Sequence, residues 1–254
     1  MSGSAALPDG YVLHRFGAIG STNDEARRLA EAGAPAGQVV VADQQTAGRG
    51  RSGRAWISPS GNLYASVLLR PTRDLRMFGQ LSLIASLALA EAIAELATTP
   101  LAIRLKGPND VLLEGGKVAG ILLESGGDGG PGGRFVIIGS GVNLTSAPAD
   151  TPYPATSLAR EGLTDLSPER LLAGYLGALE RWRAIWEQRG FAEIRTAWLA
   201  RAANLDGPIR LRLPTEQLAG RFADLTPAGA LILEQGNGSR REITAGEVVL
   251  GAGP

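Results

Sequence analysis

Apolar residues recur in two ways along the chain up to about residue 205. Short runs rich in valine, leucine and isoleucine alternate with longer stretches in which apolar positions follow helical spacing. We expect strands at 11–17, 38–43, 63–69, 101–105, 111–113, 118–123 and 135–138. We expect helices at about 22–32, 78–96 and 191–200, and one more that begins at 167–168. This part of the chain is therefore expected to pack helices against a sheet.

The pattern changes after Asp206-Gly207-Pro208. Short apolar runs now follow one another closely, without helical stretches between them, which is typical of a small β-barrel. The strands expected there are 209–213, 218–225, 230–233 and 242–250. We therefore place a domain boundary near residue 206, with one domain at 1–205 and a second at 206–254.

Three local signals mark ends and turns of these elements. Thr22 followed three residues later by Glu25 predicts a capping box at the start of the first helix. Ser167 before Pro168 predicts an N-cap followed by proline in the first helical position. Residues 114–117 predict a hairpin with a Gly-Gly turn.

Composition excludes several kinds of chemistry. The 254 residues include no cysteine, so disulfides, thiolate metal sites and cysteine nucleophiles are ruled out. The single histidine, His14, rules out a multi-histidine metal site, and we interpret it as structural. The longest apolar stretch, 81–97, contains Glu91 and Glu95 and is too short to span a bilayer. The first ten residues do not resemble a secretory signal, so we expect a cytoplasmic protein.

The run from Gly48 to Trp56 interleaves arginines with glycines. Glycine allows close approach of the backbone to a ligand, and arginine binds phosphate and carboxylate oxygens through a planar fork. Such a run could also be a disordered arm that binds nucleic acid. However, Lys+Arg and Asp+Glu both number 25, so the formal net charge is zero, and a nucleic-acid binder usually has a broader basic surface. The run therefore favours a local site for an anionic, nucleotide-like ligand.

Four segments now stand in one order along the chain. They are Ser21-Thr22-Asn23; the run from Gln45 to Trp56; Lys106-Gly107-Pro108-Asn109-Asp110 with the run from Lys117 to Glu124; and Gly139-Ser140-Gly141-Val142-Asn143. Together they resemble bacterial biotin protein ligases, in the form without an N-terminal DNA-binding domain, over nearly the whole chain. The resemblance implies an α+β fold, with a mixed, mostly antiparallel sheet and flanking helices like class II synthetases, plus a C-terminal SH3-like β-barrel. One departure is Gly107, where the family usually has tryptophan.

The resemblance also implies a two-step reaction. Biotin is activated by ATP as biotinyl-5′-adenylate, with Mg²⁺ on the ATP phosphates and no firmly assigned protein metal ligand. The biotinyl group then passes to a lysine of a biotin carboxyl carrier domain of a biotin-dependent carboxylase. The expected partners include neither DNA nor a membrane, and the chain is expected to be a monomer or homodimer.

The roles that the resemblance assigns fall into three groups. Catalytic roles are implied for Lys117, Arg49, Arg51 and Asp110, the last by orienting an arginine or by helping to hold Mg²⁺. Biotin contacts are implied for Ser21, Thr22, Asn23, Gln45, Gly48, Arg49, Lys117, Gly120, Gly139 and Gly141. Contacts with ATP or the adenylate are implied for Arg51, Arg54, Trp56, Asn109 and Asn143.

Two alternatives stay open at this point. A lipoate or octanoate ligase would share the fold and the adenylate chemistry, although the arginine-rich loop that ends in Trp56 favours biotin. A non-catalytic biotin- or nucleotide-binding module would share the binding residues. The Gly/Arg loop itself is expected to be mobile when empty, because its like charges repel one another until an anion lies between them.

Overall fold

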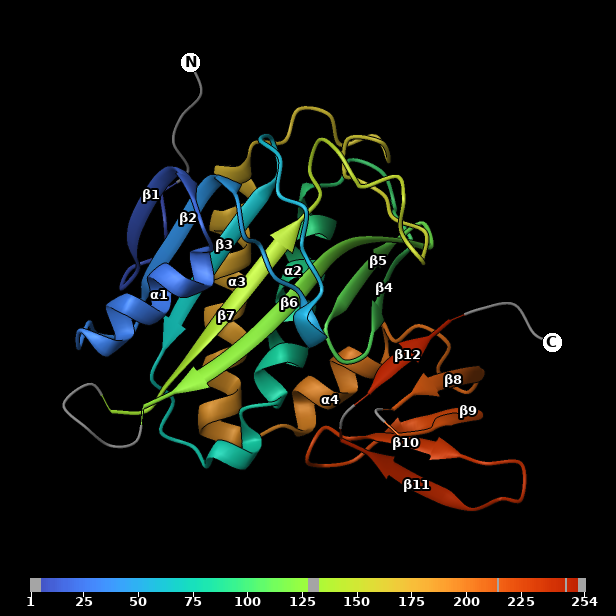
Figure 1. Ribbon diagram of the computed structural model, residues 1–254. Coiled ribbons are helices and arrows are strands. Elements are labelled where there is room, and N and C mark those ends of the chain that lie inside the picture. The colour runs from blue at the N-terminus through green and yellow to red at the C-terminus, as the bar shows by residue number, and fades with distance from the viewer. Residues whose placement is uncertain (1–5, 128–132, 214, 245, 251–254) are drawn as a thin grey trace.

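The computed structural model describes residues 6–127, 133–213, 215–244 and 246–250. Figure 1 shows a large sheet with helices on both faces and a smaller sheet made by the C-terminal strands. None of the helices in these ranges is both long and apolar enough to cross a membrane.

The large sheet has seven strands in the order β1-β2-β3-β7-β6-β5-β4. Its strands are β1 (Val12–Ile19), β2 (Gln38–Gln45), β3 (Leu63–Leu69), β4 (Ile103–Lys106), β5 (Asp110–Leu113), β6 (Gly116–Gly126) and β7 (Phe135–Val142). The pair β1/β2 is parallel, and the other pairs of this sheet are antiparallel. This confirms the predicted mixed, mostly antiparallel sheet.

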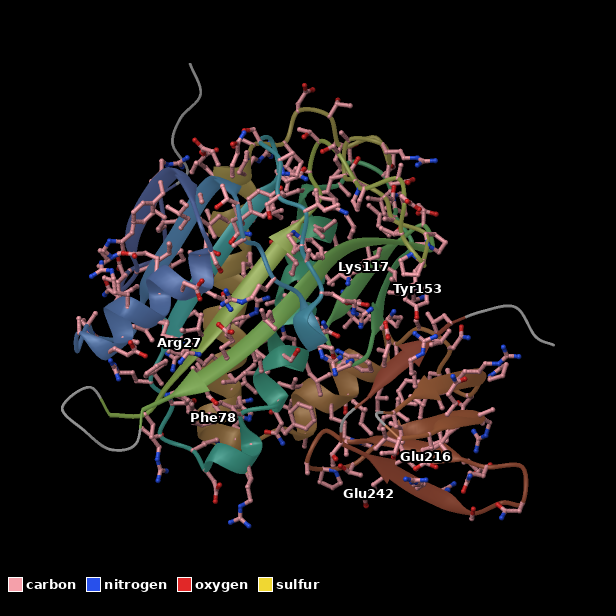
Figure 2. The ribbon with its side chains drawn as sticks, in the orientation of Figure 1. Arg27, Phe78, Lys117, Tyr153, Glu216 and Glu242 are labelled. Atoms are coloured by element: carbon pink, nitrogen blue, oxygen red, sulfur yellow. The ribbon has the colours of Figure 1, made fainter. Side chains whose placement is uncertain are left out.

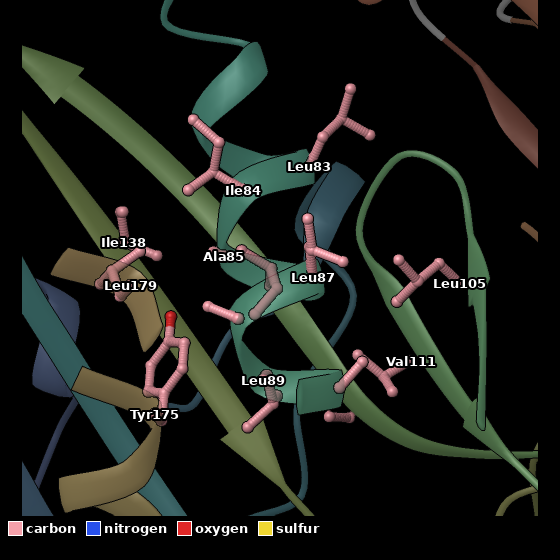
Figure 3. Close-up of a cluster of buried hydrophobic side chains, with 14 of the residues drawn as sticks. Leu83, Ile84, Ala85, Leu87, Leu89, Leu105, Val111, Ile138, Tyr175 and Leu179 are labelled. Carbon is pink, nitrogen blue, oxygen red and sulfur yellow. The ribbon is translucent and has the colours of Figure 1, made fainter. Parts of the chain in front are cut away.

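Helices cover both faces of the large sheet. Helix α1 (Thr22–Glu31) lies on one face, where Ala26 and Ala30 pack with Val40 and Leu68. The main core lies on the other face, under the helices α2 (Gln80–Leu96) and α3 (Pro168–Arg189), with α4 (Ala192–Leu199) beside them. Figure 3 shows apolar side chains of α2 meeting Tyr175 of α3 in this core. Because β3 is covered on both faces, all its residues are buried and its sequence is a continuous apolar run interrupted by a single serine, Ser66.

The C-terminal strands form a five-stranded antiparallel sheet in the order β11-β10-β9-β8-β12. They are β8 (Pro208–Arg212), β9 (Gln217–Leu225), β10 (Leu231–Glu234), β11 (Arg240–Ile243) and β12 (Glu247–Val249). This agrees with the predicted small C-terminal β unit. The sheet packs against α4, where the rings of Phe222 and Trp198 lie 6.4 Å apart in an edge-on arrangement.

Two of the three local signals were read wrongly. The N-cap of α1 is Ser21 rather than Thr22, and the Thr22 hydroxyl donates to a side chain of β2 instead of capping the helix. In the hairpin, Glu114 and Gly115 both have positive φ, at 49° and 82°, and Leu113 pairs with Gly116. The turn therefore has Glu114-Gly115 at its centre rather than Gly-Gly.

The third signal is confirmed, since Ser167 caps α3 by accepting a hydrogen bond from the Arg170 N–H at 3.2 Å. The stretch predicted as one strand at 242–250 is a further error, because it contributes to two strands. β11 and β12 lie at opposite edges of the small sheet, and Gly246 just before β12 has a φ of 147° that other residues rarely adopt.

Candidate functional site

A cavity of about 390 Å³ lies between the large sheet, the Gly/Arg loop and the start of β12. All the predicted site residues except Gly48 line it: Ser21, Thr22, Asn23, Gln45, Arg49, Arg51, Arg54, Trp56, Asn109, Asp110, Lys117, Gly120, Gly139, Gly141 and Asn143. The backbone of Gly48 lies against the other end of the loop: its carbonyl accepts a hydrogen bond from the Trp56 N–H at 2.9 Å, and a Cβ there would lie 2.5 Å from the Trp56 carbonyl oxygen. Tertiary structure thus brings together residues from four separated segments of the chain.

One end of the cavity is a buried polar network at the start of α1. The Gln45 Oε1 atom accepts hydrogen bonds from the Thr22 N–H at 2.8 Å and from the Thr22 hydroxyl at 3.1 Å. The Gln45 Nε2 group donates to Ser58 Oγ at 3.0 Å. Asn23 donates from Nδ2 to Glu124 Oε2, also at 3.0 Å. These side chains are therefore held in fixed orientations before any ligand binds.

In another part of the cavity, the ammonium groups of two lysines pair with one carboxylate, that of Asp110. Asp110 lies 2.7 Å from Lys117 Nζ and 3.0 Å from Lys106 Nζ. Burial alone would raise the Asp110 pKa, but the charges and hydrogen bonds of Lys117 and Lys106 outweigh it and lower that pKa below its usual range. Asp110 thus orients two lysines, rather than the arginine that the resemblance suggested.

Lys106 and Lys117 are the only lysines in the whole chain, whose other basic residues are arginines. Both come to the same carboxylate, one from the end of β4 and the other from the start of β6. Lys106 also lies over the ring of Tyr153, with its Nζ 4.7 Å from the ring centroid. Figure 2 shows Lys117 and Tyr153 near each other, close to the small sheet.

The loop arginines each have a partner within the protein. Arg49 pairs with Asp24 at 2.5 Å and reaches Glu124 at 3.5 Å. Arg54 pairs with Glu247 at 2.8 Å. An anionic ligand must therefore compete with acidic side chains for these two arginines.

Arg51 is the most buried of the three loop arginines and begins the short 3-10 helix η1 (Arg51–Gly53). Its guanidinium donates to Asn109 Oδ1 at 2.9 Å and to the Gly246 carbonyl at 3.0 Å. Burial lowers the Arg51 pKa from its usual range. These contacts tie the Gly/Arg loop to both β-sheets of the protein.

The Trp56 indole lies across the floor of the cavity. A Cβ on Gly141 would lie 2.5 Å from the indole, and one on Gly120 would lie 3.0 Å from it. Lys117 Nζ lies 5.3 Å from the indole centroid. A Cβ on Gly139 would meet Asn23 Oδ1 at 2.3 Å. These three glycines therefore make room for protein side chains, which the sequence alone did not indicate.

Asn143 was expected to contact ATP or the adenylate. Its Nδ2 group donates to the carbonyls of Thr156 at 3.0 Å and Lys117 at 3.4 Å. It is 3% exposed, so this amide holds together the backbone that carries Lys117.

Several residues of the site were missed from the sequence. Lys106 begins the motif Lys106–Asp110, but the sequence assigned no role to it. Ser66 is a polar residue inside an otherwise apolar strand, which could have drawn attention to it. Glu124 ends the run that begins at Lys117, and it reaches Arg49. Glu247 and Tyr153 have no sequence signal, because only the fold brings them to the cavity.

Comparisons with known proteins agree with this geometry. Residues 17–143 match the biotin/lipoate A/B protein ligase family, and residues 205–251 match the biotin protein ligase C-terminal domain. The chain is 46% identical to a biotin–[acetyl-CoA-carboxylase] ligase of Paracoccus denitrificans, over 91% of this chain and 97% of that protein. It is 36% identical to the corresponding ligase of Mycobacterium tuberculosis, over 91% of this chain and 85% of that protein.

Solved structures give the same result. The Aquifex aeolicus biotin protein ligase in complex with biotin and ATP superimposes with a TM-score of 0.79 at 29% identity, covering 93% of this chain and 97% of that one. The cavity, its paired lysines and these matches lead to one conclusion: the chain belongs to the biotin protein ligase family.

Proposed function

We propose that this protein activates biotin with ATP and transfers the biotinyl group to a lysine of a biotin carboxyl carrier domain. One observation carries the proposal: a single cavity joins a fixed polar network to a pair of ammonium groups, with an indole ring along its floor. The polar network suits the cyclic urea of biotin, and the ammonium groups suit its carboxylate and the α-phosphate. The relatives named above are biotin ligases, and one of them is known in complex with both substrates.

In the first step, a carboxylate oxygen of biotin attacks the α-phosphorus of ATP and pyrophosphate leaves. Two anions must approach each other, so the site must supply positive charge in fixed positions. Lys117 and Lys106 would supply it, because Asp110 holds both Nζ atoms within 3.0 Å of its carboxylate. Arg51 would close the site over the adenylate and exclude water from the mixed anhydride.

In the second step, the amine of the carrier lysine attacks the acyl carbon and AMP leaves with the electrons of the broken C–O bond. The sequence provides no histidine or cysteine in the cavity, and this chemistry needs no side-chain nucleophile. Catalysis would then come from positioning and electrostatics.

Mg²⁺ is expected to arrive on the ATP phosphates. Among the described residues, no group of three or more histidine, aspartate or glutamate side chains could hold a metal ion. Asp110 is already bound to two ammonium groups, so it does not fit the role of a metal ligand that the resemblance left open.

Three further proposals concern the domain organisation, the location and assembly, and the partners of the protein. The segment 206–254 is proposed as a separate domain, supported by its own antiparallel sheet. The protein is proposed to act in the cytoplasm, as a monomer or homodimer. It is proposed not to bind DNA or membranes, which the formal net charge of zero supports.

The test is biotin-dependent exchange of labelled pyrophosphate into ATP, followed by transfer to a carrier domain with either biotin or lipoate. We expect exchange and transfer with biotin and neither with lipoate. Transfer of lipoate would favour the related lipoate ligase activity, and binding of biotin without exchange would favour a non-catalytic binding module.

A further inference from the structure

Each lysine of the pair on Asp110 also faces an aromatic ring. Lys106 Nζ lies 4.7 Å from the centroid of the Tyr153 ring, and Lys117 Nζ lies 5.3 Å from the centroid of the Trp56 indole. Both distances fall within the roughly 6 Å over which an aromatic face attracts a cation. The two rings come from different loops that line the cavity. Each ammonium group thus has a ring of its own in addition to the shared carboxylate.

The carboxylate of Asp110 does not by itself balance both lysines. Its two oxygens are divided between them, with Oδ1 at 2.7 Å from Lys117 Nζ and Oδ2 at 3.0 Å from Lys106 Nζ. One negative charge therefore faces two positive charges. Glu247 also attracts Lys106, but it is already paired with Arg54 at 2.8 Å. One of the two ammonium charges at Asp110 thus lacks a carboxylate of its own.

Of the two lysines, Lys106 depends more on its ring. Its side chain is 7% exposed, whereas that of Lys117 is 29% exposed. An exposed ammonium group keeps part of its water shell, but a buried one must be compensated by protein groups. The attraction between a cation and an aromatic face is also stronger when the cation is desolvated. The Tyr153 ring therefore gives Lys106 the compensation that water gives Lys117.

The backbone that carries the Tyr153 ring is restricted. Tyr153 lies between Pro152 and Pro154, and proline fixes its own φ and favours an extended conformation for the residue before it. The Pro154 carbonyl accepts a hydrogen bond from the Lys117 N–H at 2.8 Å, and the Thr156 N–H donates to the Lys117 carbonyl at 3.0 Å. This segment is therefore bonded to the backbone of one lysine while its ring covers the side chain of the other.

We propose that Tyr153 is a positioning residue whose ring face holds the Lys106 ammonium group at Asp110, ready for the anions of the first reaction step. The inference rests on the proposed function, because it concerns how one of the two lysines of that reaction is kept in place. The role belongs to the face of the ring and not to its hydroxyl. Tyr153 acts through Lys106 and not through a contact with the substrate.

Tyr153→Phe and Tyr153→Leu separate the aromatic face from the hydroxyl. Phenylalanine keeps a ring over Lys106, whereas leucine fills part of the space without one. The measurement is kcat/KM for ATP in biotin-dependent pyrophosphate exchange. Tyr153→Phe should retain most of the wild-type value. Tyr153→Leu should lower it at least about 10-fold, because the attraction between the ring and a desolvated cation is lost.

A double-mutant cycle with Lys106→Met shows whether Tyr153 acts through Lys106. Methionine keeps most of the length of the lysine side chain and has no charge. In that background Tyr153→Leu should change kcat/KM by less than about twofold, because no ammonium group is left to hold. Where exchange by Lys106→Met is too slow to measure, the same cycle is read from the Kd of an ATP analogue with a methylene bridge between its α- and β-phosphates. That Kd is expected to follow the same pattern.

Tyr11→Leu is the matched control. Tyr11 is likewise partly buried, and it packs against the main core outside the lining of the cavity. Its hydroxyl donates to Glu180 Oε2 at 3.4 Å. The same chemical change at this position should therefore leave kcat/KM for ATP unchanged.

The outcomes separate this inference from the proposed function. If wild type shows no biotin-dependent exchange, the proposed function is wrong and this inference falls with it. If wild type is active and Tyr153→Leu matches it, or if Tyr153→Phe loses as much as Tyr153→Leu, this inference alone is overturned. An equal loss in the Lys106→Met background also overturns it, because Tyr153 would then act on the nucleotide or on its own loop. A loss seen only in Tyr153→Leu, and only when Lys106 is present, supports it.

Discussion

Asp110→Asn tests whether the carboxylate of Asp110 stabilises the fold by pairing with the buried Lys106 side chain. The Lys106 side chain is 7% exposed, and its Nζ lies 3.0 Å from Asp110 Oδ2. An amide keeps the shape of the side chain and removes its charge, so the ammonium would be left buried without a counter-charge. Removing one partner of a buried pair costs about 3–5 kcal/mol. The Lys117 side chain is 29% exposed and stays hydrated. We therefore expect the free energy of unfolding to fall by about 3 kcal/mol, near the lower end of that range.

Urea unfolding at neutral pH measures this loss as a shift in midpoint at constant slope. The pH dependence gives a second readout. The folded-state pKa of Asp110 lies below its unfolded value of 3.8, so its contribution is complete above that value and is lost as pH falls through the folded pKa. The free energy of unfolding of wild type should therefore fall as the pH is lowered below 3.8. The same acidification should lower the free energy of unfolding of Asp110→Asn less, because the variant has no carboxylate at this position.

Asp74→Asn is the control for the same chemical change. Asp74 pairs with Arg76 at 2.9 Å, but both side chains are exposed and solvent screens the pair. It should shift the urea midpoint at neutral pH far less than Asp110→Asn does. Equal shifts for the two variants would refute the view that Asp110 neutralises a buried ammonium group.

Three further variants probe the loop, the departure at Gly107 and the floor of the cavity. Arg51→Gly removes the contacts that hold the loop to both sheets, so we expect biotin to be activated but the adenylate to escape; equal retention of adenylate by the variant and wild type would contradict this. Gly107→Ala adds a Cβ at 3.4 Å from Trp198, an ordinary contact at a φ outside the left-handed region, and should stabilise by about 0.4–1 kcal/mol in thermal unfolding. A lower melting temperature would show that the site is already fully packed. Gly141→Ala places a Cβ 2.5 Å from the Trp56 indole, so the ring must move and the KM for ATP should rise at least severalfold; an unchanged KM would argue against a nucleotide contact by Trp56.

The sequence by itself determined most of the elements and most of the residues that line the site. Periodicity located the sheet and its helices because a strand or helix that buries one face must repeat its apolar residues at a fixed interval. The run from Gly48 to Trp56 indicated an anion site, because few arrangements other than a ligand-binding loop or a basic arm need alternating glycine and arginine. Arg51 belongs to that run, whereas Lys117 was singled out only by the resemblance to biotin protein ligases; both line the same cavity.

Tertiary structure decided which partners these residues contact, and several of those contacts differ from the expected ones. Thr22 predicted a helix cap but bonds to Gln45, because the fold brings β2 beside the start of α1. Asp110 meets two lysines instead of an arginine, and Gly141 makes room for an indole. Local sequence specifies backbone conformation over a few residues, whereas a hydrogen bond or ion pair between distant segments depends on how the sheet orders its strands. That order results from burial of the whole core, so no single motif contains it.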